Sequence, residues 1–163
     1  MSEYLLVNVE SSLSLDVARR ITDGALASAR EAGLLPLTVG VVDAGGHLVH
    51  FAREDGCGIA RQHIALAKAR AALGMGVDSG TIGQRLADRP AFVASIAAAT
   101  HGQFAAVPGG VLILNDEKVA VGAIGISGDA SARDEYAAIA GVRQAGFTSH
   151  PAEPADGWQN ASL

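Results

Sequence analysis

Four side chains that can transfer protons, attack as nucleophiles or bind ligands follow one another closely: Asp55, Cys57, His63 and Lys68. The first two lie in a glycine-punctuated loop before a predicted helix, and the other two lie on that helix. Loops of this kind commonly carry the chemistry of a small domain. His63 can ligate a metal or move protons near neutral pH. A lone histidine is, however, more commonly a surface or core-edge residue with one hydrogen bond.

Lys68 is the sharpest of these candidates because its helix is rich in alanine and has little room for an unpaired ammonium group. We expect an acidic partner at the junction between strand and helix, with Asp55 first and Asp43 second. A ligand carboxylate is the alternative partner. Positions 63 and 68 are separated by about 140° around the helix axis, so they do not share a narrow face.

An enzymatic interpretation assigns these side chains roles in a reaction on a small organic acid, as in a catabolic pathway. Asp55 is then the general acid or base, and Lys68 and Arg70 hold the carboxylate of the substrate. Cys57 or His63 is the second proton carrier, and a thiol near a helix start can also be a nucleophile. The chain contains no HExxH or GxSxG motif, so no catalytic signature supports this interpretation.

A second group of candidates lies in the C-terminal half of the chain. His101 and His63 could together hold an iron from two sides, although the sequence does not show that they meet. Ser127 and Gly128 end a glycine-rich strand before a predicted helix, where backbone N–H groups can face an anion. We expect Ser127 and Gly128 to be candidates for a pocket wall. The earlier Gly122 and Gly125 more simply allow a helix to pack closely on the strand.

Periodicity and turn residues predict the elements that position these candidates. Asp43-Ala44-Gly45-Gly46 separates two apolar runs and predicts a hairpin, with Asp43 bonding its own backbone two residues on. Helices are predicted at 14–32, 59–73, 79–87, 90–99 and 131–145, and a second hairpin at 111–126. Ser14 is the expected N-cap of the first helix, and Ser131 with Asp134 resembles a capping box. This order predicts an α/β sandwich with antiparallel pairing.

Composition sets the class of protein. A length of 163 residues predicts one domain, which we assign to 1–147, followed by an extended tail at 148–163 whose Trp158 docks on a neighbour. A net charge of −5 with scattered basic residues argues against nucleic acid as a partner. No window approaches the ~20 apolar residues that a membrane span needs. One cysteine excludes an internal disulfide and a multi-cysteine zinc site, and the first ten residues lack a signal-peptide pattern, so we expect a cytoplasmic protein.

Several motifs carry a family resemblance by their order and spacing. They are VVDAGGHLVHF at 41–51, EDG at 54–56, KA at 68–69, PGGV at 108–111 and VGAIGISG at 121–128. Over about residues 14 to 146 the chain resembles the GlcG/HbpS family, the "haem-degrading" domain also found at the C-terminus of PduO proteins. The resemblance implies a profilin-like α/β/α sandwich with about five antiparallel strands. It also implies a homo-oligomer, because members of the family are oligomers.

The resemblance further implies a small-ligand-binding protein, with haem or another tetrapyrrole as the ligand. His63 and His101 are then the candidate iron ligands, and Arg70 or Lys68 the partner of a propionate; the protein alone is expected to hold no metal. Asp55 and Lys68 match recurrent family positions. Ala71 stands where haem-binding relatives often carry Thr, and an alanine cannot ligate iron. The pocket therefore suits an anion or a propionate better than iron itself. An accessory subunit without a small ligand is a third interpretation.

Overall fold

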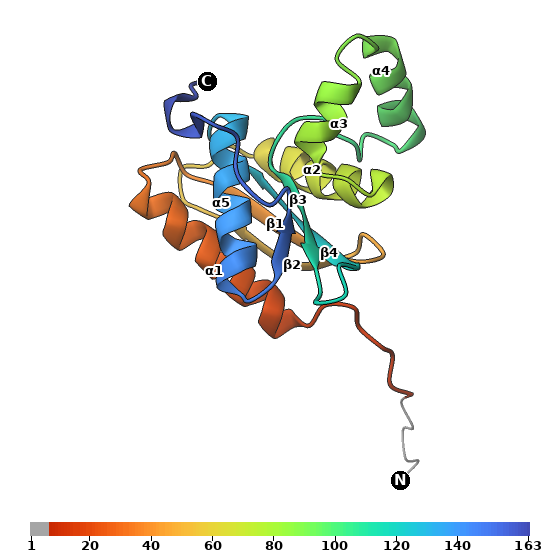
Figure 1. The fold of residues 1–163 in the computed structure, drawn as a ribbon, viewed down its shortest axis with the longest axis vertical. Helices are drawn as coiled ribbons and strands as arrows, with labels where there is room; N and C mark the ends of the chain where they lie inside the picture. The colour runs from red at the N-terminus through yellow and green to blue at the C-terminus, as the bar shows by residue number, and fades with distance from the viewer. Residues whose placement is uncertain (1–6) are drawn as a thin grey trace.

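The computed structural model of the chain describes residues 7–163 as a five-stranded antiparallel sheet between two layers of helices (Figure 1). The strands are β1 (Thr38–Asp43), β2 (Leu48–Arg53), β3 (Gly110–Leu114), β4 (Ala120–Ser127) and β5 (Thr148–His150). The helices are α1 (Leu15–Glu31), α2 (Arg61–Met75), α3 (Ser79–Arg85), α4 (Pro90–Ala99), α5 (Ser131–Gln144) and the 3-10 turn η1 (Trp158–Asn160). The strand order β2-β1-β4-β3-β5 confirms the predicted α/β sandwich with an antiparallel sheet.

Helices α1 and α5 pack against each other and cover one face of the sheet (Figure 1). Ser14 caps α1 as predicted, since its hydroxyl accepts a hydrogen bond from the Val17 N–H at 3.3 Å. The main core lies between these helices and the central strands, and it is almost wholly aliphatic. Its largest fully buried members are Ile21, Leu37, Ile113, Ile124, Ile126 and Ile139.

Helix α2 covers the opposite face and lies unusually close to it, because small residues meet on both sides. Ala69 and Ala72 pack on β1, β3 and β4. A Cβ at Gly125 of β4 would collide with the Ala65 carbonyl oxygen, and one at Gly110 would collide with the carbonyl oxygen of Lys68. The close helix packing predicted for Gly125 is therefore confirmed. Beyond α2, helices α3 and α4 extend away from the sheet (Figure 1).

Three local expectations differ from the structure. Helix α2 begins and ends two residues later than predicted, because its N-cap Ala60 offers no side-chain bond to mark the start. Ser131 does not cap α5: the N-cap is Ala130, so the predicted capping box is wrong. The tail is not simply extended, since 148–150 pair with β3 as the fifth strand. Trp158 stacks on Tyr136 of the same chain, with ring centroids 3.7 Å apart.

No helix within residues 7–163 is both long and apolar enough to cross a membrane. Part of the N-terminal stretch from which we expected no signal peptide, residues 1–6, lies outside the described residues.

Candidate functional site

Two neighbouring cavities lie between the β1–β2 hairpin turn, α2 and the loop after α4. The larger, of about 540 Å³, is lined by Ala44, Gly45, Gly46, His47, Leu48, Arg70, Leu73, Gly74 and Gln103. The smaller, of about 230 Å³, is lined by His63, Leu66, Ala67, Arg70, His101, Gly102 and Gln103. Because both cavities share Arg70 and Gln103, we treat them as one feature, the Arg70 groove. Its volume falls in the range typical of small-ligand sites.

The smaller cavity brings His63 and His101 to one site, although they lie far apart in the sequence. His63 is exposed on the first turns of α2, with Nε2 3.2 Å from the Gln62 side-chain amide. His101 follows the end of α4 in a left-handed conformation, with φ of 54°. That conformation reverses the chain after the helix, and the Gly102 N–H then bonds back to the Ala97 carbonyl at 2.7 Å.

Arg70 lies at the junction of the two cavities, where it is half-buried. Its Nε donates to the Gly46 carbonyl at 3.1 Å, which holds the side chain over the hairpin turn. Neither lining contains an acidic residue, although the whole chain has a net charge of −5. Three of the five histidines of the chain, His47, His63 and His101, line the groove. The groove is therefore suited to an anionic ligand.

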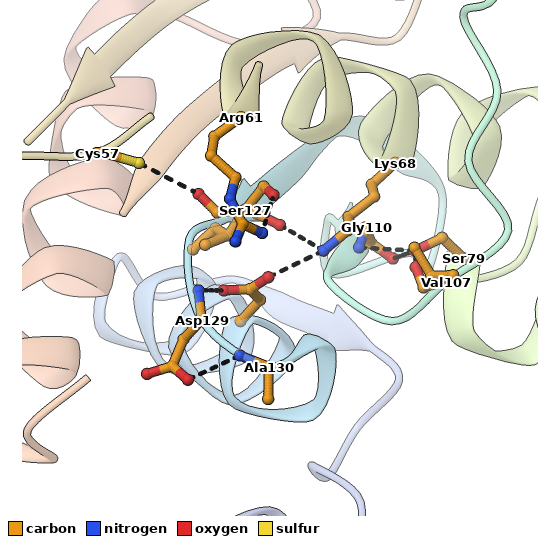
Figure 2. Close-up of polar contacts among 11 residues, drawn as sticks. Cys57, Arg61, Lys68, Ser79, Val107, Gly110, Ser127, Asp129 and Ala130 are labelled. Atoms are coloured by element: carbon orange, nitrogen blue, oxygen red, sulfur yellow. Dashed lines mark hydrogen bonds and ion pairs between the residues drawn. The ribbon is translucent and has the colours of Figure 1, made fainter. Parts of the chain in front are cut away.

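Lys68 points beneath α2 toward β4 and α5 (Figure 2), and it lines neither cavity of the groove. Its side chain is 2% exposed, and Nζ donates to the Ile126 carbonyl at 2.8 Å and to Asp134 Oδ2 at 3.0 Å. The expectation that Asp55 or Asp43 pairs with Lys68 is wrong. The partner comes from α5, and Gly109 leaves the space that Nζ occupies, since a Cβ there would lie 2.9 Å away.

The Lys68–Asp134 pair is fully enclosed by protein. Asp134 Oδ1 accepts a further hydrogen bond from the Asp129 N–H at 3.0 Å. Burial lowers the pKa of Lys68, and the charge of Asp134 opposes that shift. Burial likewise raises the pKa of Asp134, against the opposing charge of Lys68. With both short contacts of Nζ made to protein, the pair does structural work and presents no charge to a ligand.

A second buried acidic group lies beside this pair. Burial, with a contribution from the charge of Asp78, raises the pKa of Glu135 to about 7, against the Gly109 N–H and Lys68, which lower it. Asp78 caps α3 through Oδ1, which accepts from the Thr81 N–H at 2.8 Å. Its Oδ2 is 3.3 Å from His150 Nδ1, outside hydrogen-bonding geometry. Asp78, Glu135 and His150 give no signal in the sequence, because nothing in their spacing brings α3, α5 and β5 together.

Cys57, Ser127 and Gly128 are all buried. The thiol of Cys57 lies 3.2 Å from Thr38 Oγ1 and 3.8 Å from the Ser127 carbonyl oxygen (Figure 2). Ser127 Oγ accepts from Arg61 Nη1 at 3.4 Å. A Cβ on Gly128 would collide with the Pro36 carbonyl oxygen. The three residues therefore pack the end of β4, and none of them offers an open surface to a ligand.

Asp55 lies in a different cavity of about 460 Å³, with Arg30, Pro36, Arg53 and Glu54. Asp55 is exposed there, whereas Lys68 and Cys57 are buried. The structure thus does not bring the three proposed catalytic side chains together. Ala71, which occupies the position of the ligating Thr in the resemblance, is buried against α3 and α4 beside Ile82.

His47 and Gln103 are the polar groove residues that were not expected from the sequence. The signal for His47 is the turn itself: Asp43 Oδ1 accepts from the N–H groups of Gly45 and His47, each at 2.9 Å, and lies 3.2 Å from Nδ1 of the His47 ring. Gln103 gives no comparable signal.

Within residues 7–163, no three His, Cys, Asp or Glu side chains cluster as a set that could bind a metal ion. The groove nevertheless has a donor set that fits a haem group: imidazoles that can meet an iron, and an arginine that can meet a carboxylate. Leu48, Leu66 and Leu73 add apolar wall, and no aromatic ring lines either cavity. By residue type, the lining therefore fits the iron and the propionates of a haem group.

Comparisons with known proteins show the family and the fold. The family model described as "Haem degrading protein HbpS-like" matches residues 13–143. The PduOC:heme complex is similar with a TM-score of 0.75 at 22% identity, over 85% of this chain and 98% of that chain. HbpS is similar with a TM-score of 0.69 at 25% identity, over 85% and 92%. Klebsiella pneumoniae protein ORFY is similar with a TM-score of 0.71 at 20% identity, over 86% and 97%. No curated protein sequence matches the chain.

Proposed function

The chain belongs to the HbpS-like family, and from that premise we propose that it binds haem or another tetrapyrrole in the Arg70 groove. The observation that carries the proposal is the lining: one arginine and three histidines around two cavities that share Arg70 and Gln103, without a carboxylate. The heme complex of the similar PduOC protein supports the choice of ligand class. Bound haem would supply the redox and Lewis-acid chemistry of its iron.

The residues have separate roles in this proposal. Arg70 offers its terminal guanidinium nitrogens to a propionate, because only its Nε is committed to the Gly46 carbonyl. His63 and His101 are the candidate iron ligands, since both line the smaller cavity. Lys68 has no role at the ligand, because its ammonium group is enclosed with Asp134.

A hemin titration followed in the Soret region tests the proposal. We expect a saturable Soret shift with the wild-type chain, and a changed band position when His63→Ala and His101→Ala are combined. His50→Ala is the matched control: it lines neither cavity, and its partner Thr22 keeps a hydrogen bond to the Ala18 carbonyl. Absence of any shift contradicts haem binding. A shift that survives removal of both histidines contradicts their role as iron ligands.

The enzymatic alternative requires Asp55, Cys57 and Lys68 to act on one substrate. Two of these side chains are buried and the third opens onto another cavity, so no contact among them favours that function. We therefore prefer the binding function.

We propose in addition that the chain forms a homo-oligomer. Helix α4 has no buried residue, and Phe92 on it remains 41% exposed. Such an apolar helix is typical of a surface that a partner covers. Size-exclusion chromatography with light scattering is expected to give a multiple of 16.5 kDa, and a monomer at micromolar concentration contradicts the proposal.

A further inference from the structure

The hairpin turn at one end of the Arg70 groove holds His47 in a defined orientation. Asp43 Oδ1 lies 3.2 Å from His47 Nδ1, while the same oxygen accepts from the N–H groups of Gly45 and His47. Burial alone would raise the pKa of Asp43, but those two N–H donors and the His47 ring hold it below its ordinary value. The ionised carboxylate lies against Nδ1, so Nε2 is the ring nitrogen that Asp43 does not contact.

Gly45 provides the space for this orientation. A Cβ at position 45 would lie 2.7 Å from His47 Cε1 and 2.8 Å from Nδ1, so the ring occupies the place of a missing side chain. The backbone of Gly45 is not in the left-handed region, so an alanine there would press on the ring and, at 3.3 Å, on Asp43 Oδ1. Gly45→Ala therefore displaces the imidazole from Asp43 without removing it.

Arg70 lines the same cavity from the side of α2. Its Nε bond to the Gly46 carbonyl places the guanidinium beside the turn that carries His47. Among residues 7–163, no acidic side chain lies within ion-pair distance of Arg70. A fixed cation and an oriented imidazole thus face one cavity of about 540 Å³ whose lining contains no carboxylate.

We propose that Arg70 and His47 form a carboxylate-binding subsite at the hairpin end of the groove. A ligand carboxylate accepts two hydrogen bonds from the terminal nitrogens of Arg70, and a third from the His47 ring when both ring nitrogens carry a proton. Asp43 is a positioning residue, since it acts on the ligand only through the ring of His47. The matching ligands are a free dicarboxylate or the propionate arms of a tetrapyrrole.

For a tetrapyrrole, this subsite rests on the proposed function and adds the orientation of the ligand in the groove. Propionates held by Arg70 and His47 lie in the larger cavity, and the rest of the tetrapyrrole then extends past Arg70 and Gln103 toward His63 and His101. Carboxylate recognition and iron ligation are thereby assigned to opposite ends of the groove, so they can be tested separately.

Metal-free protoporphyrin IX and its dimethyl ester separate the two ends, because neither probe carries iron. We expect the wild-type chain to bind the free acid at least about tenfold more tightly than the ester, by fluorescence titration. Arg70→Met should abolish that preference, and Gly45→Ala should reduce it severalfold. Gly58→Ala is the matched control, since a Cβ there meets nothing within 4 Å and its backbone is not left-handed. It should keep the full preference.

Succinate tests the subsite without any porphyrin. We expect a saturable shift of the His47 Cε1–Hε1 NMR signal, assigned with His47→Gln, and loss of that shift in Arg70→Met. A succinate response without porphyrin binding supports the subsite and refutes the tetrapyrrole function. Porphyrin binding with equal affinity for acid and ester, together with no succinate response, overturns the subsite and leaves the proposed function standing. If no porphyrin binds and succinate gives no response, both are refuted.

Discussion

Two cations two residues apart on α2 lie in opposite environments. Lys68 is buried beneath the helix, where Asp134 and the Ile126 carbonyl satisfy its ammonium group. Arg70 lies above the hairpin turn, half-exposed, with only its Nε bonded to protein. The Lys68 ammonium group holds α2, β4 and α5 together, whereas the Arg70 guanidinium remains available to a ligand. The presence of a cation on this helix therefore says little about function until its direction is known.

The largest effect is expected from breaking the buried pair. Lys68→Met leaves the Asp134 carboxylate buried without its partner, and we expect it to lower the free energy of unfolding by about 3–5 kcal/mol. Adding Asp134→Asn should recover most of that loss, because the amide oxygen can still accept from the Asp129 N–H. Urea denaturation of both variants measures this. If Lys68→Met alone is as stable as wild type, the Lys68–Asp134 pair is either not charged or not buried.

The next effect concerns the buried acidic group Glu135, which makes the free energy of unfolding depend on pH. The pKa of Glu135 rises from 4.5 to about 7 on folding, so the folded state holds more protons between these values. Stability from this group is complete below about pH 4.5 and is lost as the pH rises through 7. We expect Glu135→Gln to remove that slope and to be about 2–3 kcal/mol more stable than wild type at pH 8. If the free energy of unfolding changes with pH in the same way in wild type and in Glu135→Gln, the pKa of Glu135 is not raised by burial.

Two glycines, Gly125 beneath α2 and Gly45 in the hairpin turn, allow a matched test of how tightly each region is packed. Gly125→Ala places a Cβ against the backbone of α2, which cannot yield, and should cost about 1–3 kcal/mol of unfolding free energy. Gly45→Ala meets only side-chain atoms, the exposed ring of His47 and Asp43 Oδ1, and should change stability by no more than about 0.5 kcal/mol. Thermal melts of both variants check the contrast. Equal losses mean that the hairpin turn is as tightly packed as the sheet.

Local signals predicted most of the fold. The Asp43 turn and the Ser14 cap each depend on a few neighbouring residues, and both are confirmed. β5 was missed because three residues before Pro151 carry no readable alternation, and only pairing with β3 makes them a strand.

The sites were harder to predict, because they depend on how distant elements meet. Sequence spacing suggested that Asp134 belongs to a helix cap, yet its partner is Lys68 on another helix. The approach of His63 to His101 depends on where α4 ends against α2. Side-chain direction on a tightly packed helix decides such contacts, and residue type alone does not.

The central claim is that ligand recognition belongs to the Arg70 groove and not to the buried charges. Its most direct test compares hemin affinity and unfolding free energy for Arg70→Met and for the double variant Lys68→Met/Asp134→Asn. Arg70→Met should weaken hemin binding by about 10- to 100-fold while changing stability by no more than about 0.5 kcal/mol. The double variant should bind hemin as wild type does. Unchanged affinity in Arg70→Met, or a loss of affinity confined to the double variant, would contradict the account.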